Sequence, residues 1–369
     1  MSLSGRNIAF RADASVRIGT GHVMRCLTLA DGLREAGASC RFVMREHPGH
    51  LAELVQARGH SALLLPPGEG KNDDALPHSA WLGTDWRTDA AQTSAALAGA
   101  PVDLLVLDHY ALDQRWQTGL ADRTARWMVI DDLADRPILA DVLLDQNLGT
   151  QAADYAPFAS PGARLLIGPR YAPLRPEFAA AHDRIASAPA QTALRRILVA
   201  VSGTDPDNVS ERLLDRLDAA PLPRDIAITV ILGASAPHVA AVRARAARMP
   251  APTQLLVGAG DMSQVFATAD LCIGATGGMS WERCCVGLPT LLLILADNQV
   301  KAARALVQAG AGDMVGDVRA PGWETRFDAA LDAALDPGRR AAMRYRALEV
   351  CDGRGTVRIV AALQDLWKV

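Results

Sequence analysis

His22 occupies a position where a side chain could take up a proton. It lies in the stretch IGTGHVMRC (residues 18–26), between a glycine turn and the predicted first turn of a helix. The positive end of a helix dipole disfavours a cationic imidazole, so we expect His22 to be neutral near neutral pH and able to act as a general base. Asp13 ends the preceding apolar run and could orient His22. A lone histidine in a loop also commonly caps or packs, and the residues alone leave that alternative open.

The stretch GATGGMSWERCCVGLP (274–289) could hold a phosphate group. Gly277 and Gly278 let bare backbone N–H groups approach an anion, and the predicted helix that follows adds about half a positive charge at its N-terminus. Glu282 would point its carboxylate at the same region, as an acidic group does when it holds ribose hydroxyls. A dinucleotide-binding GxGxxG motif is absent. A glycine turn with a capping glutamate is an equal alternative.

Two further loops carry polar residues directly after apolar runs. AVSGTDPDN (200–208) contains Gly203 and Thr204, and Asp207 or Asn208 could cap the helix that follows. By itself this loop indicates a helix cap more than a ligand site.

The second of these loops, LDHYALD, ends its run with Asp108, His109 and Tyr110. In open parallel sheets, ligands bind beyond the carboxyl ends of the strands. All four loops follow a predicted strand, so each has the position at which an α/β protein binds its ligand.

Short apolar runs alternate along the chain with longer segments of helical period. In the first half the runs are NIAFRA, CRFVMR, SALLLP, DLLVLD, WMVIDD, DVLLDQN and RLLIG; after the proline-containing residues 170–194, a second series begins at RRILVAVSGTDPDN. This alternation predicts βαβ units on parallel sheets. We therefore expect an α/β protein of two Rossmann-like domains, residues 1–180 and 181–369. The C-terminal stretch GTVRIVAALQDLW is a predicted amphipathic helix that could pack back on the first domain.

Length and composition favour two cores and a small-molecule ligand. A chain of 369 residues, half of them hydrophobic, exceeds one ordinary core. The formal net charge of −3 gives no electrostatic reason to expect nucleic acid or an anionic membrane as partner. No apolar run is long enough to span a bilayer. The six cysteines form no CxxC pair, which favours a cytoplasmic location.

No metal or other cofactor is expected from the sequence. It contains no HxxxH pair, and the adjacent Asp131 and Asp132 are expected to be solvated rather than to bind an ion. The oligomeric state is left open, with a monomer favoured.

Taken together, the motifs resemble a known enzyme family over nearly the whole chain. The matching stretches are RADASVRIGTGHVMRCLTLADGL, LLVLDHY, DDLADR, DVLLDQN, GPRYAPLRPEF, VSGTDPDN and GATGGMSWERCCVGLPTLLLILADNQ. They resemble the UDP-sugar hydrolases of pseudaminic acid synthesis, which cleave UDP-2,4-diacetamido-2,4,6-trideoxy-β-L-altropyranose. The resemblance implies a GT-B fold, in which two Rossmann-like domains face each other across a cleft that holds the UDP-sugar.

The resemblance also implies roles for individual residues. The histidine of the family's G-x-G-H segment, its proposed base, matches His22. Asp13 and Gly21 are then expected on the sugar side, and Tyr110 and Asn298 match sugar-side or phosphate-side contacts. For UDP binding the matching residues are Gly203, Thr204, Gly277, Gly278, Met279 and Glu282. Two features depart from the family pattern: Ser202 precedes Gly203 where two glycines are expected, and residues 66–83 form a longer stretch than the family needs.

The implied reaction needs one base. UDP is a good leaving group, and bound backbone N–H groups can stabilise its developing charge, so a general acid is dispensable. A water deprotonated by His22 would attack the anomeric carbon with inversion. Two alternatives remain: a GT-B glycosyltransferase, in which an acceptor hydroxyl replaces the water, and a non-catalytic module that binds a nucleotide-sugar.

Overall fold

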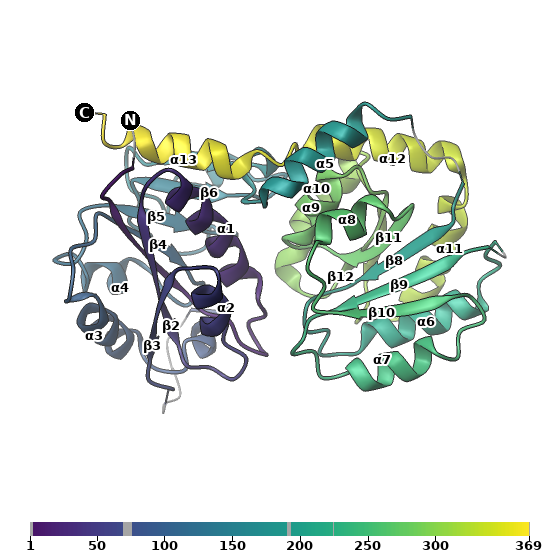
Figure 1. Cartoon of the computed structure of the whole chain (residues 1–369), viewed down its shortest axis with the longest axis horizontal. Helices are drawn as coiled ribbons and strands as arrows, with labels where there is room; N and C mark the ends of the chain where they lie inside the picture. The colour runs from purple at the N-terminus through teal and green to yellow at the C-terminus, as the bar shows by residue number, and fades with distance from the viewer. Residues whose placement is uncertain (1–2, 69–75, 190–192, 224, 369) are drawn as a thin grey trace. The chain divides into compact units, whose positions relative to one another are not determined.

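The computed structural model describes residues 3–68, 76–189, 193–223 and 225–368. The chain divides into two compact units, Met1–Pro173 together with Gly355–Val369, and Leu174–Arg354 (Figure 1). The boundary expected between residues 180 and 181 falls inside helix α5 (Pro176–Ala186), which belongs wholly to the second unit.

The first unit is built on a parallel sheet. In the part of the chain that the structure describes, this sheet has seven strands in the order β3-β2-β1-β4-β5-β6-β7. The order reverses direction between β1 and β4, and such a reversal opens a crevice beyond the carboxyl ends of those two strands. The strands are β1 (Asn7–Ala12), β2 (Ser39–Arg45), β3 (Ser61–Leu65), β4 (Leu104–Asp108), β5 (Trp127–Ile130), β6 (Val142–Asp145) and β7 (Arg164–Ile167).

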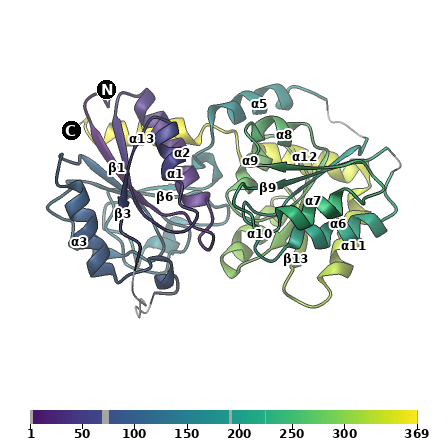
Figure 2. The same cartoon turned by 60° about the horizontal axis from the view of Figure 1, so that its bottom comes forward.

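Helices cover both faces of this sheet. They are α1 (Gly21–Glu35), α2 (Ala52–Ala57), α3 (Trp86–Leu97), α4 (Gln114–Thr118) and α13 (Gly355–Asp365), with short 3-10 helices at Ser79–Trp81 (η1), Ala152–Tyr155 (η2) and Pro169–Tyr171 (η3). Figures 1 and 2 show α3 on the opposite side of the sheet from α1 and α13. Side chains alternate between the two faces of a strand. Ile8 and Phe10 accordingly join the core with α1 and α13, whereas Ala9 joins the core with Leu97 of α3.

The second unit repeats the same plan. Its described residues form a six-stranded parallel sheet in the order β10-β9-β8-β11-β12-β13, with the reversal between β8 and β11. The strands are β8 (Arg196–Ala200), β9 (Ala227–Leu232), β10 (Thr253–Val257), β11 (Leu271–Ala275), β12 (Thr290–Ile294) and β13 (Asp313–Asp317). Besides α5, the helices are α6 (Val209–Ala219), α7 (Val239–Ala246), α8 (Met262–Ala267), α9 (Met279–Cys285), α10 (Val300–Gln308), α11 (Trp323–Ala334) and α12 (Pro337–Val350), with a 3-10 helix at Asp297–Gln299 (η4).

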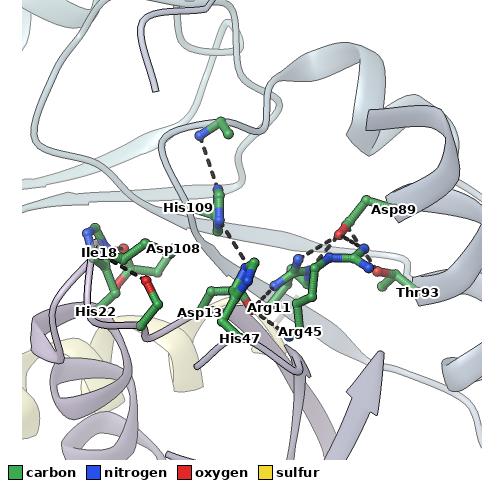
Figure 3. A network of polar contacts seen from close by, with 12 residues as sticks. Arg11, Asp13, Ile18, His22, Arg45, His47, Asp89, Thr93, Asp108 and His109 are labelled. Carbon is green, nitrogen blue, oxygen red and sulfur yellow. Dashed lines mark hydrogen bonds and ion pairs between the residues drawn. The ribbon is translucent and has the colours of Figure 1, made fainter. Parts of the chain in front are cut away.

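A buried ionic network ties the first sheet to α3. Arg11 of β1 donates to Asp89 of α3 (Nη2 to Oδ2, 2.7 Å) and to Asp13 (Nη1 to Oδ1, 2.6 Å). Arg45 of β2 also donates to Asp89 (Nη2 to Oδ2, 2.5 Å), and so does the indole N–H of Trp116. All four charged side chains are fully covered. The positive charges of two guanidinium groups are therefore neutralised by two carboxylates, and all four groups are shielded from water (Figure 3).

Replacing Asp89 with alanine should lower the free energy of unfolding of the first unit by about 3–5 kcal/mol, because Arg11 and Arg45 would keep buried charges without this partner. Urea denaturation would measure the loss. Asp85→Ala is the matched control, since it removes only the exposed N-cap of the same helix and should cost about 1 kcal/mol. Equal losses in the two variants would contradict this account of the network.

Candidate functional site

His22 and Asp108 form a close pair at the carboxyl edge of the first sheet. β1 and β4 run side by side, with Ala12 opposite Asp108, and α1 begins just after β1. The first turn of α1 thereby carries the imidazole over the end of β4, where Nδ1 of His22 lies 2.6 Å from Oδ1 of Asp108 (Figure 3). The His22 side chain retains 11% of its exposure, while that of Asp108 is fully covered.

The pair fixes which imidazole nitrogen can accept a proton. An ionised carboxylate only accepts hydrogen bonds, so Nδ1 of His22 carries the hydrogen that faces Asp108. In the neutral ring Nε2 is then the basic nitrogen. Among the residues that the structure describes, no group hydrogen-bonds this nitrogen. The arrangement suits a general base oriented by a carboxylate.

Arg25, one turn further along α1, holds Asp108 in its ionised form. It donates twice to the carboxylate, from Nε to Oδ2 at 2.6 Å and from Nη2 to Oδ1 at 2.7 Å. Burial alone would raise the pKa of Asp108, but the charge of Arg25 and the bonds from Arg25 and His22 hold that pKa well below its usual range. Asp108 is therefore an anion at any pH near neutrality.

Asp132 links this pair to Tyr110. Its Oδ2 accepts from Arg25 (Nη1, 2.6 Å) and from the Tyr110 hydroxyl (2.5 Å), and its Oδ1 accepts from the Asn147 side-chain amide (3.1 Å). The hydroxyl of Tyr110, a residue only 5% exposed, is thus already engaged within the protein. The expectation that Asp131 and Asp132 are solvated is wrong, because Asp131 is 1% exposed and Asp132 is held by these three donors.

Asp13 lies under the site. It shares the sheet face of Arg11, which is the face opposite α1, so its carboxylate points toward α3 rather than toward His22. Besides Arg11, Oδ1 accepts the backbone N–H of Arg45 (2.7 Å), and Oδ2 lies 3.3 Å from Nε2 of His109. Its side chain is completely covered. In this arrangement Asp13 presents no oxygen to a ligand, and Asp108 takes the role of orienting His22.

Gly21, by contrast, is exposed at the first position of α1. A Cβ added there would meet no other atom within 4 Å.

In the second unit, the glycine loop follows β11. Cβ atoms added at Gly277 or Gly278 would meet nothing within 4 Å, so both positions are open to an approaching group. The N–H of Gly277 donates to the Ser280 hydroxyl (3.2 Å). This amide therefore has a hydrogen-bond partner within the protein, whereas the sequence analysis expected it to be unpaired. Met279 opens α9 and Glu282 follows in its first turn.

Glu282 has an unusual electrostatic environment. Burial raises the pKa of Glu282 to about 7, against the positive charges of Arg175 and Arg283. The Arg175 guanidinium lies 3.9 Å from the carboxylate and also donates to the carbonyl oxygen of Gly260 (3.2 Å). Sequence reasoning did not single out Arg175, although it lies in GPRYAPLRPEF directly before the proline that opens α5.

The loop after β8 places Gly203 and Thr204 at the same edge of the second sheet, one strand away from the glycine loop. The helix cap expected from Asp207 or Asn208 comes instead from Asp205. Its carboxylate accepts the backbone N–H groups of Val209 and Ser210, each at 2.9 Å. Thr204 is buried, while the carbonyl oxygen of Gly203 accepts from the N–H of Gly233 (2.8 Å).

Asn298 lies in η4, after β12, and is exposed. The structure thus groups the predicted residues within each unit. His22, Gly21 and Tyr110 lie at the carboxyl edge of the first sheet. The predicted nucleotide residues and Asn298 follow β8, β11 and β12, which are adjacent strands of the second sheet.

Within the described ranges, no cluster of three or more histidine, cysteine or acidic side chains is arranged to hold a metal ion. The helices of these ranges include none that is both long and apolar enough to cross a membrane.

Comparison with known proteins gives distant but full-length similarities. No protein-family model matches the chain. The spore coat polysaccharide biosynthesis protein SpsG of Bacillus subtilis (strain 168) is 24% identical over 370 residues, which cover 98% of this chain and 99% of SpsG. The structure of MurG from Acinetobacter baumannii matches with a TM-score of 0.69 at 16% identity, over 98% of this chain and 99% of that one. The spinosyn rhamnosyltransferase SpnG, solved with thymidine diphosphate, matches with a TM-score of 0.66 at 17% identity, over 98% and 99%.

These similarities and the two parallel-sheet units define a GT-B type of fold, the architecture of nucleotide-sugar glycosyltransferases. The predicted fold class is confirmed.

The His22 tautomer gives a direct test of the pair described above. We expect nitrogen chemical shifts of ¹⁵N-histidine-labelled protein at alkaline pH to show the His22 hydrogen on Nδ1. In Asp108→Asn this preference should weaken, because a side-chain amide can also donate to Nδ1. Asp13→Asn is the matched control and should change the signal of His109 while that of His22 stays the same. A wild-type His22 with its hydrogen on Nε2 would contradict the assigned geometry.

Proposed function

We propose that this protein hydrolyses a UDP-linked diacetamido-trideoxy sugar at the anomeric C–O bond, with inversion. It would release UDP and the free sugar used in nonulosonic (pseudaminic) acid synthesis. The observation that supports this most is the His22–Asp108 pair, in which Nδ1 is held at 2.6 Å and no described group hydrogen-bonds Nε2. The sequence motifs and the GT-B fold add the nucleotide-sugar part of the proposal.

In the proposed reaction, Nε2 of His22 takes a proton from a water molecule as the water oxygen attacks the anomeric carbon. The bond from that carbon to the UDP oxygen breaks, and its electron pair leaves with UDP. The imidazolium that forms is stabilised by the ionised Asp108, which Arg25 keeps in place. A carboxylate that orients and stabilises a catalytic histidine in this way need not accept the proton itself.

The UDP moiety would bind to the second unit, through Gly203, Thr204, Gly277, Gly278 and Met279. Open glycine positions allow a diphosphate to approach the backbone, and Glu282 would accept hydrogen bonds from the ribose hydroxyls. Asn298 and Gly21, both exposed, remain the candidates for sugar or phosphate contacts.

A UDP-sugar glycosyltransferase is the second candidate function. The similarity to the rhamnosyltransferase SpnG favours it, because the same fold there serves transfer. The chemistry at His22 would be identical except that an acceptor hydroxyl replaces water. A non-catalytic module that binds nucleotide-sugars is a weaker candidate, since such a module has no need of a histidine paired with a buried carboxylate.

Incubating the protein with a panel of UDP-linked 2,4-diacetamido-2,4,6-trideoxy sugars and no acceptor separates these functions. A hydrolase releases UDP and free sugar, which mass spectrometry would identify. Each reaction is run in parallel with EDTA and with added Mg²⁺, because the scheme uses no metal and turnover should survive chelation. UDP release that depends on an added acceptor would favour the transferase, and no turnover under either condition would favour the binding module.

His22→Asn should lower kcat by about 10²–10⁴-fold, the usual contribution of a positioned proton transfer, with UDP affinity unchanged. UDP release and calorimetry would measure the two quantities. His238→Asn replaces a partly exposed histidine of the second unit, whose Nε2 lies 2.9 Å from the carbonyl oxygen of Pro206, and should match the wild-type kcat. A His22→Asn enzyme with near wild-type kcat would reduce His22 to a turn residue.

Glu282→Gln should weaken UDP binding about tenfold or more, because charge-assisted hydrogen bonds to the ribose contribute roughly 1.5–3 kcal/mol. With the pKa of Glu282 near 7, the carboxyl is mostly neutral at pH 6 and mostly ionised at pH 8, so wild-type affinity should rise over this interval. The UDP phosphates titrate in the same way with wild type and variant. The difference between the two profiles of UDP affinity against pH therefore reports the ionisation of Glu282 alone. Parallel profiles would place the ribose contact elsewhere.

A further inference from the structure

Two aromatic residues from the stretch between β3 and α3 stand beside His22. His78 and Trp81 belong to the longer segment, residues 66–83, that departs from the family pattern. Within this segment, residues 69–75 lie outside the described ranges, whereas the part from residue 76 onward forms η1 and leads into α3.

The rings of these residues form one continuous cluster with Tyr110 and His22. Trp81 stacks on Tyr110, with centroids 5.6 Å apart and planes at 27°. His78 lies 4.6 Å from Trp81 and 5.2 Å from Tyr110. His22 forms T-shaped contacts with Tyr110 and Trp81, with ring centroids 4.7 Å and 6.0 Å apart. We name His78, Trp81 and Tyr110 the aromatic wall.

Within this wall, Tyr110 is the covered member. It is 5% exposed, and its hydroxyl donates to Asp132. His78 and Trp81 are both partly exposed, so they supply the accessible surface of the wall. Burial lowers the pKa of His78, which favours a neutral ring there. A ligand carbon attacked by a water at His22 would therefore lie next to an uncharged aromatic surface.

An aromatic surface of this kind suits the face of a pyranose that presents its C–H groups. The face of an aromatic ring carries partial negative charge and the C–H groups of a sugar carry partial positive charge, so the two pack favourably. A diphosphate would instead need hydrogen-bond donors, which the proposal assigns to the second unit.

We propose that His78 and Trp81 determine the sugar specificity of this site by packing against the pyranose of the bound UDP-sugar. The inference rests on the proposed UDP-sugar ligand, but it holds for hydrolysis and transfer alike. Trp81 contributes the larger surface, and His78 holds the indole against Tyr110. His78 and Trp81 would then select the sugar, while His22 and the glycine loop serve the shared chemistry.

Binding measurements on the full chain test this without relying on turnover. In the His22→Asn background, calorimetry compares the Kd of UDP with the Kd of each member of the UDP-linked diacetamido sugar panel. The Kd of UDP divided by the Kd of the UDP-sugar that binds most tightly reports how much affinity the pyranose contributes. Adding Trp81→Ala should reduce this ratio at least tenfold with the Kd of UDP unchanged, and Trp81→Phe should retain most of it. His78→Ala should reduce the ratio by a smaller factor.

Trp86→Ala is the matched control, because Trp86 opens α3 and packs against Arg87 and Arg115. It should leave the ratio unchanged. The inference is overturned if Trp81→Ala leaves the ratio as it is, or if no sugar of the panel binds the parent protein more tightly than UDP. Where Trp81→Ala impairs folding, Trp81→Phe and His78→Ala decide by the same ratio. Failure of the proposed hydrolysis has a separate signature: no UDP release from wild type, with the Trp81 effect on binding intact.

Discussion

The contact between the Asp108 carboxylate and the His22 imidazole is the interaction on which the first unit's site depends. It exists because β1 and β4 are neighbours, which places the end of one strand under the helix that follows the other. The strand order reverses between β1 and β4, so the helices that follow these two strands run toward opposite sides of the sheet. The space beyond the carboxyl ends of β1 and β4 therefore stays open. Arg25 then fixes the charge of Asp108, and through Asp132 the same guanidinium fixes Tyr110. The orientation of the imidazole and the charge of the Asp108 carboxylate thus follow from strand order.

A second layer of charge lies on the other face of the same strands. Arg11, Asp13, Arg45 and Asp89 neutralise one another, and His109 adds a neutral ring at Asp13. The N–H of Ala111 donates to Nδ1 of His109, so the His109 hydrogen is on Nε2 and faces the Asp13 carboxylate. Buried pairs of this kind contribute little net stability but are costly to break. Their effect is to hold the strand ends rigidly beneath the pair that would do chemistry.

The sequence predicted the fold class well, because buried parallel strands read as short apolar runs between helical segments. It also placed His22 at the start of a helix. It did not identify Asp108 as the partner, since that contact joins residues 86 positions apart through a strand order that periodicity does not reveal. One signal was available. Side chains alternate between the two faces of a strand. Asp13 is two positions from Arg11 and therefore lies on the face away from α1, whereas Asp108 is two positions from Val106 and lies on the face that α1 covers. The contacts of Arg175 and Trp81 depend on loop geometry, which no local pattern encodes.

The path of the chain through the first unit bears on how the protein is made. α13 supplies Ile359, Ala362 and Leu363 to the same core as β1 and α1, yet it leaves the ribosome only after the whole of the second unit. The second unit, by contrast, is one continuous segment and can complete its core as soon as Arg354 has emerged. The first unit must wait, with one face of its sheet incompletely covered, until α13 has emerged. A chain that stops before α13 lacks part of the cover of the unit translated first, so the complete fold of the first unit depends on a helix that is synthesised after the second unit.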